Sequence, residues 1–177
     1  MRFALMPHPT TPEPAVAALT CEVARPGGDR LALRYRLVGD LQALAVPPAS
    51  EPARADELWR HTCFEAFLRT PGTPDYLEFN FSPSTAWAAY AFDDYRSGMR
   101  LADVPNPSLA VECSDDVLCV TAELHDLPPG VWSLALTAVI ENRDDRRSYW
   151  ALSHPPGPPD FHRPDCFVAE VPPPPAP

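Results

Sequence analysis

Lysine is absent from the sequence, whose 14 basic residues are all arginine. They stand against 24 acidic residues, which gives the 177-residue chain a formal net charge of -10. Nucleic acids and anionic membranes are themselves negative, so bulk electrostatics does not draw a chain of this charge to either. We therefore expect neither nucleic acid nor a membrane as a partner.

The sequence also lacks long apolar runs and paired cysteines. No stretch of 18 apolar residues occurs, and residues 1–14 hold four prolines without the apolar segment of a signal peptide. The five cysteines are odd in number and include no Cys-x-x-Cys pair, which argues against a disulfide framework and a zinc ribbon. We expect a cytoplasmic protein with reduced, mostly buried thiols at Cys21, Cys63, Cys113, Cys119 and Cys166.

Signatures of common enzyme classes are missing as well. There is no glycine-rich phosphate loop, no nucleophile elbow and no His-Glu-x-x-His motif. Cys63 and His61 would point the same way on one strand, so a cysteine nucleophile with a histidine base is conceivable. Nothing in the sequence marks this cysteine as activated. The sequence favours a non-catalytic protein and leaves an enzyme as an alternative.

Glycine is scarce, with seven residues, whereas proline is abundant, with 25. Proline interrupts helices, which disfavours helical bundles and doubly wound folds. Short segments instead alternate apolar and polar side chains between Pro, Gly, Asp or Asn clusters, which is typical of antiparallel strands. About nine or ten strands predict an all-β fold, a two-sheet antiparallel jelly-roll-like β-sandwich, with residues 1–171 as its single domain. Residues 172–177 form a proline-rich tail.

Three strand pairings can be given a register from their apolar positions. Residues 18–25 pair with 30–38, residues 60–69 with 76–82, and residues 109–113 with 118–122. The facing apolar residues are Leu19 with Leu37, Cys21 with Tyr35, Val23 with Leu33, Phe64 with Phe81, Ala66 with Phe79, Leu68 with Leu77, Leu109 with Ala122, Val111 with Val120, and Cys113 with Leu118. Further strands are expected at 86–92, 132–140, 148–152 and 166–171. The expected core includes Phe64, Phe79, Phe81, Val111, Val120, Leu134 and Leu136.

The other face of the second pairing is polar. In this register Glu65 lies opposite Asn80, and a tight turn at Pro83-Ser84 brings Trp87 opposite Asn80 from the next strand. The same face carries His61, Cys63, Phe67 and Glu78. A row of carboxylate, amide and aromatic ring suits a sugar, whose hydroxyls and apolar ring face need those groups. The alternative is a sheet face that is half exposed, or covered by a loop, with its polar groups satisfied locally.

A second polar cluster lies near the C-terminus, where residues 148–154 are followed by the Pro/Gly-rich residues 155–159. This stiff linker holds His154 in a defined relation to Asp160 and His162. Two histidines and an aspartate are a possible ligand set for a divalent metal. The favoured interpretation is structural: a hydrogen bond from an imidazole to Asp160 would pin the loop to the sandwich.

Six segments carry a resemblance to a known family: LWRHTCFEAF (58–67), YLEFNFSPS (76–84), WAAY (87–90), YRSGM (95–99), YWALSH (149–154) and PDFH (159–162). With these segments in this order, the chain resembles the small bacterial, cytoplasmic DOMON-like proteins. Those proteins are similar in turn to family-nine carbohydrate-binding modules. The resemblance spans nearly the whole chain, and it implies a β-sandwich that binds a sugar or haem.

The resemblance also implies site residues. The positions that match the sugar contacts of related modules are Glu65, Asn80 and Trp87. Further candidates to line the site are Trp59, His61, Glu78, Trp150 and His154. Haem-binding relatives use an axial methionine and histidine, which here would be Met99 and His154. The absence of Cys-x-x-Cys-His excludes a covalently attached haem.

The sequence therefore favours a non-catalytic module that binds a small ligand, a sugar or sugar derivative, without a cofactor. A module for b-type haem or a divalent metal is the first alternative, and a carbohydrate-active enzyme is the second. A monomer and a homodimer are both compatible with the sequence, because an exposed Trp87 suits an oligomer contact as well as a ligand platform.

Overall fold

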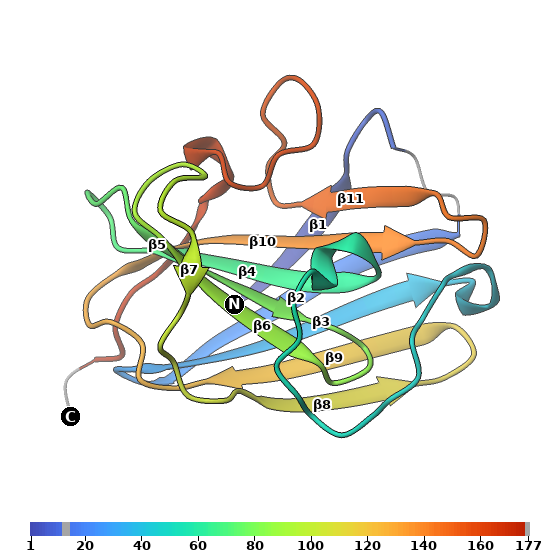
Figure 1. The fold of residues 1–177 in the computed structure, drawn as a ribbon, viewed down its shortest axis with the longest axis horizontal. Helices are drawn as coiled ribbons and strands as arrows, with labels where there is room; N and C mark the ends of the chain where they lie inside the picture. The colour runs from blue at the N-terminus through green and yellow to red at the C-terminus, as the bar shows by residue number, and fades with distance from the viewer. Residues whose placement is uncertain (12–14, 176–177) are drawn as a thin grey trace.

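The computed structural model describes residues 1–11 and 15–175. Within these ranges the chain forms antiparallel strands, three short 3-10 helices and no α-helix, so the predicted all-β class is confirmed (Figure 1). The strands are β1 (Arg2–Pro7), β2 (Val16–Gly27), β3 (Arg30–Gly39), β4 (Cys63–Arg69), β5 (Tyr76–Phe81), β6 (Trp87–Phe92), β7 (Arg100–Leu101), β8 (Ser108–Cys113), β9 (Val117–Leu124), β10 (Trp132–Glu141), β11 (Arg147–Ala151) and β12 (Ala169–Val171). The 3-10 helices are η1 (Leu41–Ala43), η2 (Leu58–Arg60) and η3 (Pro164–Cys166).

No helix in the described chain is both long and apolar enough to cross a membrane. Of the proline-rich tail, residues 172–175 form no strand, and residues 176–177 lie outside the described part of the chain.

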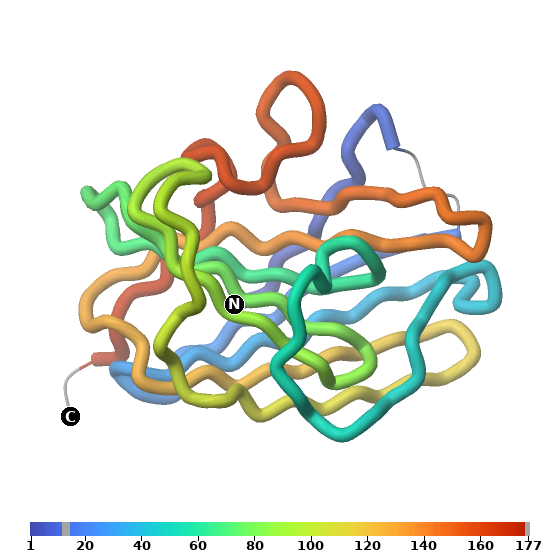
Figure 2. The backbone as a smooth tube through the Cα atoms, in the orientation of Figure 1, coloured from blue at the N-terminus to red at the C-terminus, as the bar shows by residue number. Residues whose placement is uncertain are grey.

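The strands form one continuous sheet that curls on itself, rather than two separate sheets. Its order is β7-β6-β5-β4-β10-β11-β1-β2-β3-β9-β8, with β12 added to β10. Strand β1 joins two halves of this sheet and changes partner along its length. The first half consists of β2, β3, β9 and β8, and the second half of β11, β10, β12, β4, β5, β6 and β7. The first residues of β1, Arg2 to Leu5, pair with β2, whereas Met6 and Pro7 pair with β11. In the view of Figure 2, strands of the two halves cross, with the green chain of β6 in front of the light-blue chain of β3.

The hydrophobic core fills the space enclosed by the curl. Tyr35 of β3 packs against Phe64 of β4, with ring centroids 5.2 Å apart, and its hydroxyl donates to the Glu65 carbonyl oxygen at 2.6 Å. Of the predicted core residues, the structure buries Phe64, Phe79, Phe81, Val120, Leu134 and Leu136. Val111 is only partly buried because β8 is an edge strand of the sheet.

The three predicted registers are confirmed. Leu19 faces Leu37 in the β2–β3 pair, Phe64 faces Phe81 in the β4–β5 pair, and Val111 faces Val120 in the β8–β9 pair. Glu65 lies opposite Asn80, as the alternation of β4 and β5 predicts. Apolar matching on one face was enough to fix these pairings, because a slip of one residue would turn every apolar side chain outward.

The predicted pairing of β5 with β6 is wrong by one residue. Asn80 lies opposite Ala88, and Trp87 lies opposite Phe81. The connection is one residue longer than a tight turn at Pro83-Ser84: the Ser82 amide donates to the Ala86 carbonyl, and Thr85 adopts a left-handed conformation with φ 71°. The slip exchanges the faces of the strand, so Trp87 enters the core, while Ala88 and Tyr90 join the polar face.

Candidate ligand-binding site

The polar face of the second half of the sheet is covered by loops and contains a cavity of about 310 Å³. Its floor consists of sheet residues: Glu65, Phe67, Glu78, Phe92, Val139 and Tyr149. Its walls come from three segments outside the strands: Trp59 of η2, Arg96 and Met99 of the β6–β7 loop, and Pro159, Asp160, Phe161 and His162 of the loop after β11. Loops therefore cover this face and leave room for a small molecule.

Glu65 lies at the centre of this floor. It stands on β4 between Asn80 of β5 and Thr137 of β10, and only 2% of it is exposed. The Thr137 hydroxyl donates to Glu65 Oε2 at 2.8 Å, and no donor of the described residues reaches Oε1. Burial raises the pKa of Glu65 to about 8, with a further contribution from the nearby Glu78 carboxylate, while the threonine hydrogen bond opposes the shift.

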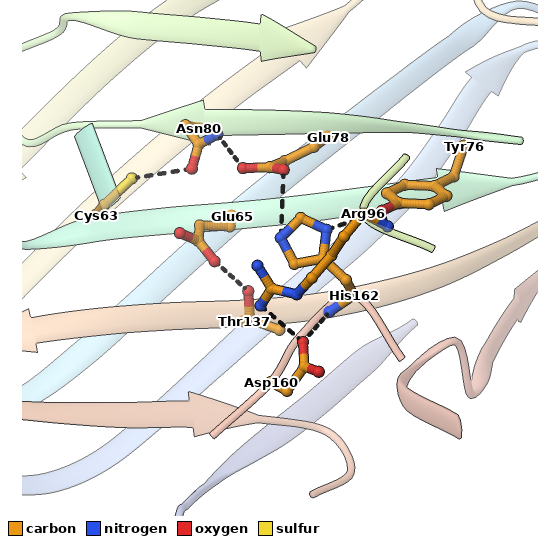
Figure 3. Close-up of polar contacts among 9 residues, drawn as sticks. All are labelled: Cys63, Glu65, Tyr76, Glu78, Asn80, Arg96, Thr137, Asp160 and His162. Carbon is orange, nitrogen blue, oxygen red and sulfur yellow. Dashed lines mark hydrogen bonds and ion pairs between the residues drawn. The ribbon is translucent and has the colours of Figure 1, made fainter. Parts of the chain in front are cut away.

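Glu78 is the second buried carboxylate and is 5% exposed. The Asn80 side-chain amide donates its N–H to Glu78 Oε1 at 2.7 Å, and the Cys63 thiol donates to Asn80 Oδ1 at 3.5 Å (Figure 3). Burial raises the pKa of Glu78 to about 7, although Asn80 and the more distant Arg96 favour the ionised form. Two carboxyl groups with raised pKa values thus share one cavity floor, on adjacent strands.

His162 stands above this floor. Its Nδ1 lies 2.8 Å from the Tyr76 hydroxyl, which accepts the Arg96 backbone N–H at 3.2 Å. These contacts fit a tautomer in which Tyr76 donates to Nδ1 and the ring proton is on Nε2, 3.8 Å from Glu78 Oε2. Burial and the neighbouring Arg96 guanidinium lower the pKa of His162 to about 4, so the imidazole is neutral at pH 7.

Arg96 and Asp160 link the two loops that form the wall. The guanidinium donates to Asp160 Oδ1 at 2.8 Å, and the Tyr95 hydroxyl donates to Oδ2 at 2.6 Å. Burial alone would raise the pKa of Asp160, but the hydrogen bonds from Tyr95 and Arg96 outweigh it and lower the pKa. Figure 2 shows residues 93–99 beside the segment that follows residue 159. This pairing closes one side of the cavity.

Aromatic rings supply the apolar part of the cavity. Trp59 is half-buried and packs edge-on against Tyr90, with ring centroids 5.6 Å apart, and the Tyr90 hydroxyl donates to Asp56. On the other side, Tyr149 and Phe161 pack together at 6.1 Å. The cavity therefore offers ring faces and edges at its walls and carboxylate oxygens at its floor.

The structure brings only some of the predicted site residues together. Glu65, Glu78 and Trp59 line the cavity, and Asn80 orients Glu78. Trp87 is 3% exposed in the core, where the Arg54 guanidinium covers its ring at 4.5 Å. This overturns both its place in the polar row and its role as an exposed oligomer contact.

Trp150 and His61 also lie outside the cavity lining. Trp150 is buried on the core side, and its indole N–H donates to the Ser148 hydroxyl at 2.9 Å. His61 is held by Glu141, with Nδ1 2.7 Å from Oε2. Cys63 is fully buried, and burial raises the pKa of its thiol, which is the opposite of what an activated nucleophile needs. The proposed Cys63 and His61 pair is therefore not supported.

The C-terminal cluster differs from the expectation. His154 Nε2 donates to the Met6 carbonyl oxygen at 2.7 Å. Asp160 accepts from Arg96, from Tyr95 and, at 3.2 Å, from the backbone N–H of His162, but from no imidazole N–H of the described residues. Within the described ranges no three His, Cys, Asp or Glu residues form a group able to hold a metal ion. Of the two residues considered as axial haem ligands, Met99 lines the cavity and His154 does not.

Several residues of the site were missed by the sequence analysis. Thr137, which donates to Glu65, carries the hydroxyl in the otherwise apolar residues 134–140 of β10, which is a signal that strand alternation alone could have used. Phe161 and Tyr149 lie next to residues that were singled out. Arg96 carries no such signal, because its position depends on the conformation of the β6–β7 loop, where Arg96 itself has φ 50° and Gly98 has φ 67°.

The sequence matches no protein-family model and no curated protein. Solved structures with a similar fold include a protein from Bacteroides uniformis to which carbohydrate binding is ascribed, at 12% identity and a TM-score of 0.65 over 95% of this chain and 84% of that chain. A family 9 carbohydrate-binding module (CBM9) from Caldicellulosiruptor kristjanssonii in complex with cellotriose has 10% identity and a TM-score of 0.57, over 88% of this chain and 74% of that chain. A complex of a CBM9 from the same organism with glucose has 10% identity and a TM-score of 0.53, over 88% and 75%. At these identities the likeness establishes the fold.

Proposed function

We propose that the protein is a non-catalytic module that binds a small polyhydroxylated ligand, a sugar or sugar derivative, in the cavity above β4 and β5. The observation that carries this proposal is the pair of buried carboxylates, Glu65 and Glu78, each of which keeps one oxygen without a hydrogen-bond donor from the described residues. Both residues line the cavity, so the hydroxyl groups of a ligand can supply these oxygens with the donors that the described chain does not.

The rest of the cavity suits the same ligand class. Trp59, Tyr149 and Phe161 offer aromatic surface to the apolar C–H face of a pyranose. Asp160 and Arg96 add a fixed acceptor and donor at the wall. A volume of about 310 Å³ falls at the small end of ligand pockets, which fits a single sugar ring better than a long chain.

Two further lines of support come from outside the cavity. The structural neighbours are carbohydrate-binding proteins, and two of them hold cellotriose and glucose. The sequence segments that resemble DOMON-like proteins include residues 58–67 and 76–84, which contain Trp59, Glu65 and Glu78. We place the protein near these modules in function, with the pocket on the Glu65 face as its binding site.

Titration calorimetry with glucose, other common monosaccharides and cellotriose tests the proposal. We expect at least one monosaccharide to bind in the micromolar to millimolar range, and Trp59→Ala to weaken it roughly tenfold because the ring surface is lost. Leu101→Ala, an exposed apolar residue outside the cavity, is the matched control and should bind as the unchanged protein does. Absence of binding across the panel would overturn the proposal, and hydrolysis of glycosides by the purified protein would replace it with an enzyme.

A further inference from the structure

The charges around the cavity floor do not balance. Glu65 contacts Thr137, and Glu78 contacts Asn80, both of which are neutral. The remaining contact is His162, whose Nε2 lies 3.8 Å from Glu78 Oε2 and whose imidazole is partly buried and neutral. Neither carboxylate therefore has a charged group in direct contact within the described part of the chain, and the only charged group there that favours the ionised form of Glu78 is the more distant Arg96.

The one cation of the cavity is already committed elsewhere. Arg96 forms its ion pair with Asp160, at 2.8 Å, in a contact that also fixes the two loops of the wall. Asp160 keeps that pairing through a second donor, the Tyr95 hydroxyl. Three carboxyl groups line the cavity, those of Glu65, Glu78 and Asp160, against one guanidinium and one neutral imidazole, so acidic side chains outnumber basic ones.

We propose that the ligand of this cavity carries an ammonium group that binds between Glu65 and Glu78, which makes it a small polyhydroxylated amine such as an amino sugar. This inference rests on the proposed sugar-binding function and narrows its ligand class. An ammonium group has three donors and no acceptor, so it matches two carboxylate oxygens that have no donor of their own. A hydroxyl has one donor and brings two lone pairs, so it serves only one of those oxygens.

When no ligand is bound, a proton on one of the carboxyl groups can take the place of the ammonium group. With both pKa values raised, at least one of the two carboxyl groups is protonated at neutral pH when no ligand is present. An ammonium ligand would displace that proton, so its affinity should rise with pH until the amine itself loses its charge. The other groups that face the pair are Cys63, Tyr76, Tyr90, Arg96, Asp160 and His162, and at pH 6 to 8 their charges are constant.

Calorimetry on matched pairs tests the inference. The first pair is glucosamine and glucose, and the second is glucamine and sorbitol, in which an amine replaces one hydroxyl. We expect the amine of at least one pair to bind about tenfold tighter than its neutral partner at pH 8, which corresponds to one charge-assisted contact. Because the glucamine nitrogen stays protonated in this range, its affinity should fall by roughly tenfold from pH 8 to pH 6 as the carboxylates take up protons.

Two substitutions assign the effect to the pair. Glu65→Gln and Glu78→Gln each keep the side-chain shape and the hydrogen bond from Thr137 or Asn80, and each should remove most of the preference for the amine. Glu141→Gln is the control, because Glu141 is a buried carboxylate of the same half of the sheet that pairs with His61 and Arg147 outside the cavity. It should leave the preference unchanged. A thermal melt of each variant shows whether it is folded.

The outcomes separate the two proposals. Equal affinity for amines and neutral sugars at pH 8 would overturn the ammonium site and leave sugar binding intact. A preference for amines that survives both glutamine substitutions would also overturn it, since the charge would then lie elsewhere. If no sugar, polyol or amine of the set binds, both the ammonium site and the proposed function are overturned.

Discussion

Glu65 and Glu78 make the cavity costly to the fold when they are ionised. A carboxyl group whose pKa is raised on folding holds its proton more tightly in the folded state than in the unfolded state. Its contribution to stability is therefore fully present below its ordinary pKa and is lost as pH rises through the folded value. For this pair the loss extends through neutral pH, since the folded pKa values are about 8 and about 7.

The substitution Glu65→Gln should therefore stabilise the protein in alkaline solution. The amide removes a buried charge and can still accept from Thr137, so we expect a melting temperature at least about 3 °C above that of the unchanged protein at pH 9, corresponding to about 1 kcal/mol. At pH 6.5 the gain should be smaller. Differential scanning calorimetry at the two pH values measures it, with the exposed Glu123→Gln of β9 as a control for loss of one negative charge. An equal gain at both pH values would mean that Glu65 is not titrating.

Strand alternation predicted part of this site and failed at an identifiable place. Glu65 and Asn80 could be paired from sequence because both neighbouring positions on each strand are apolar and must face the core. The face of Trp87 could not be predicted, because it depends on whether the preceding turn has two or three loop residues. The third loop residue, Thr85, has a left-handed conformation that a threonine side chain gives no reason to expect. Arg96 depends on a loop whose path follows from tertiary contacts with Asp160.

The loops are the elements that turn a sheet face into a cavity. Asp160 lies in the loop after β11, and its carboxylate holds the β6–β7 loop through Tyr95 and Arg96. Because these hydrogen bonds lower its pKa, the contribution of Asp160 to stability is present above the ordinary carboxyl pKa and is lost only as pH falls through the lower folded value. An imidazole partner would instead have made that contribution depend on histidine titration near pH 6.

Asp160→Asn should lower the free energy of unfolding by about 1 kcal/mol, and by the same amount at pH 6 and pH 9, because the lowered pKa of Asp160 and the raised pKa of Arg96 keep this ion pair charged at both pH values. Urea unfolding at the two pH values measures the change. Asp165→Asn is a matched control, since its ion pair with Arg163 is exposed and should contribute little. A loss at pH 6 that disappears at pH 9 would restore the histidine interpretation.

At the scale of the whole molecule, the sheet encloses most of the reactive side chains. Four of the cysteines are buried, and Cys113, at the end of the edge strand β8, is exposed. Cys21 and Cys63 lie on different halves of the curl, so exposing both requires more than local opening. Simultaneous loss of protection at both thiols would therefore report unfolding of the whole sheet rather than local opening of one half.

Alkylation with iodoacetamide followed by mass spectrometry should modify one thiol of the folded protein within minutes and all five after denaturation. Cys113→Ser should remove the early modification and leave the later ones in place. Rapid modification of a second cysteine in the native state would show that one half of the sheet opens on its own.

The curl itself was the part of the architecture that the sequence did not predict. The apolar alternation of each strand states which face is buried, but it does not state whether two groups of strands share hydrogen bonds. Residues 2–7 form the strand that connects the two halves, but their sequence gives little indication of a strand, because the segment is short and ends in Pro7. A two-sheet sandwich and a single curled sheet bury the same residues, so only the partner change at Leu5 and Met6 distinguishes them.

This partner change has a consequence for the order of folding. On one side, β1 pairs with residues that follow soon after it, Leu5 with Leu19, and on the other side with residues near the opposite end of the chain, Met6 with Ala151. The entropy of closing a loop grows with its length, and contacts distant in sequence form slowly. The pairing of β1 with β2 belongs to an early meander with β3, whereas its pairing with β11 must wait until nearly the whole chain has been synthesised. The pairing of β1 with β11 is therefore expected to form last. The cavity, whose wall follows β11 directly, forms together with it.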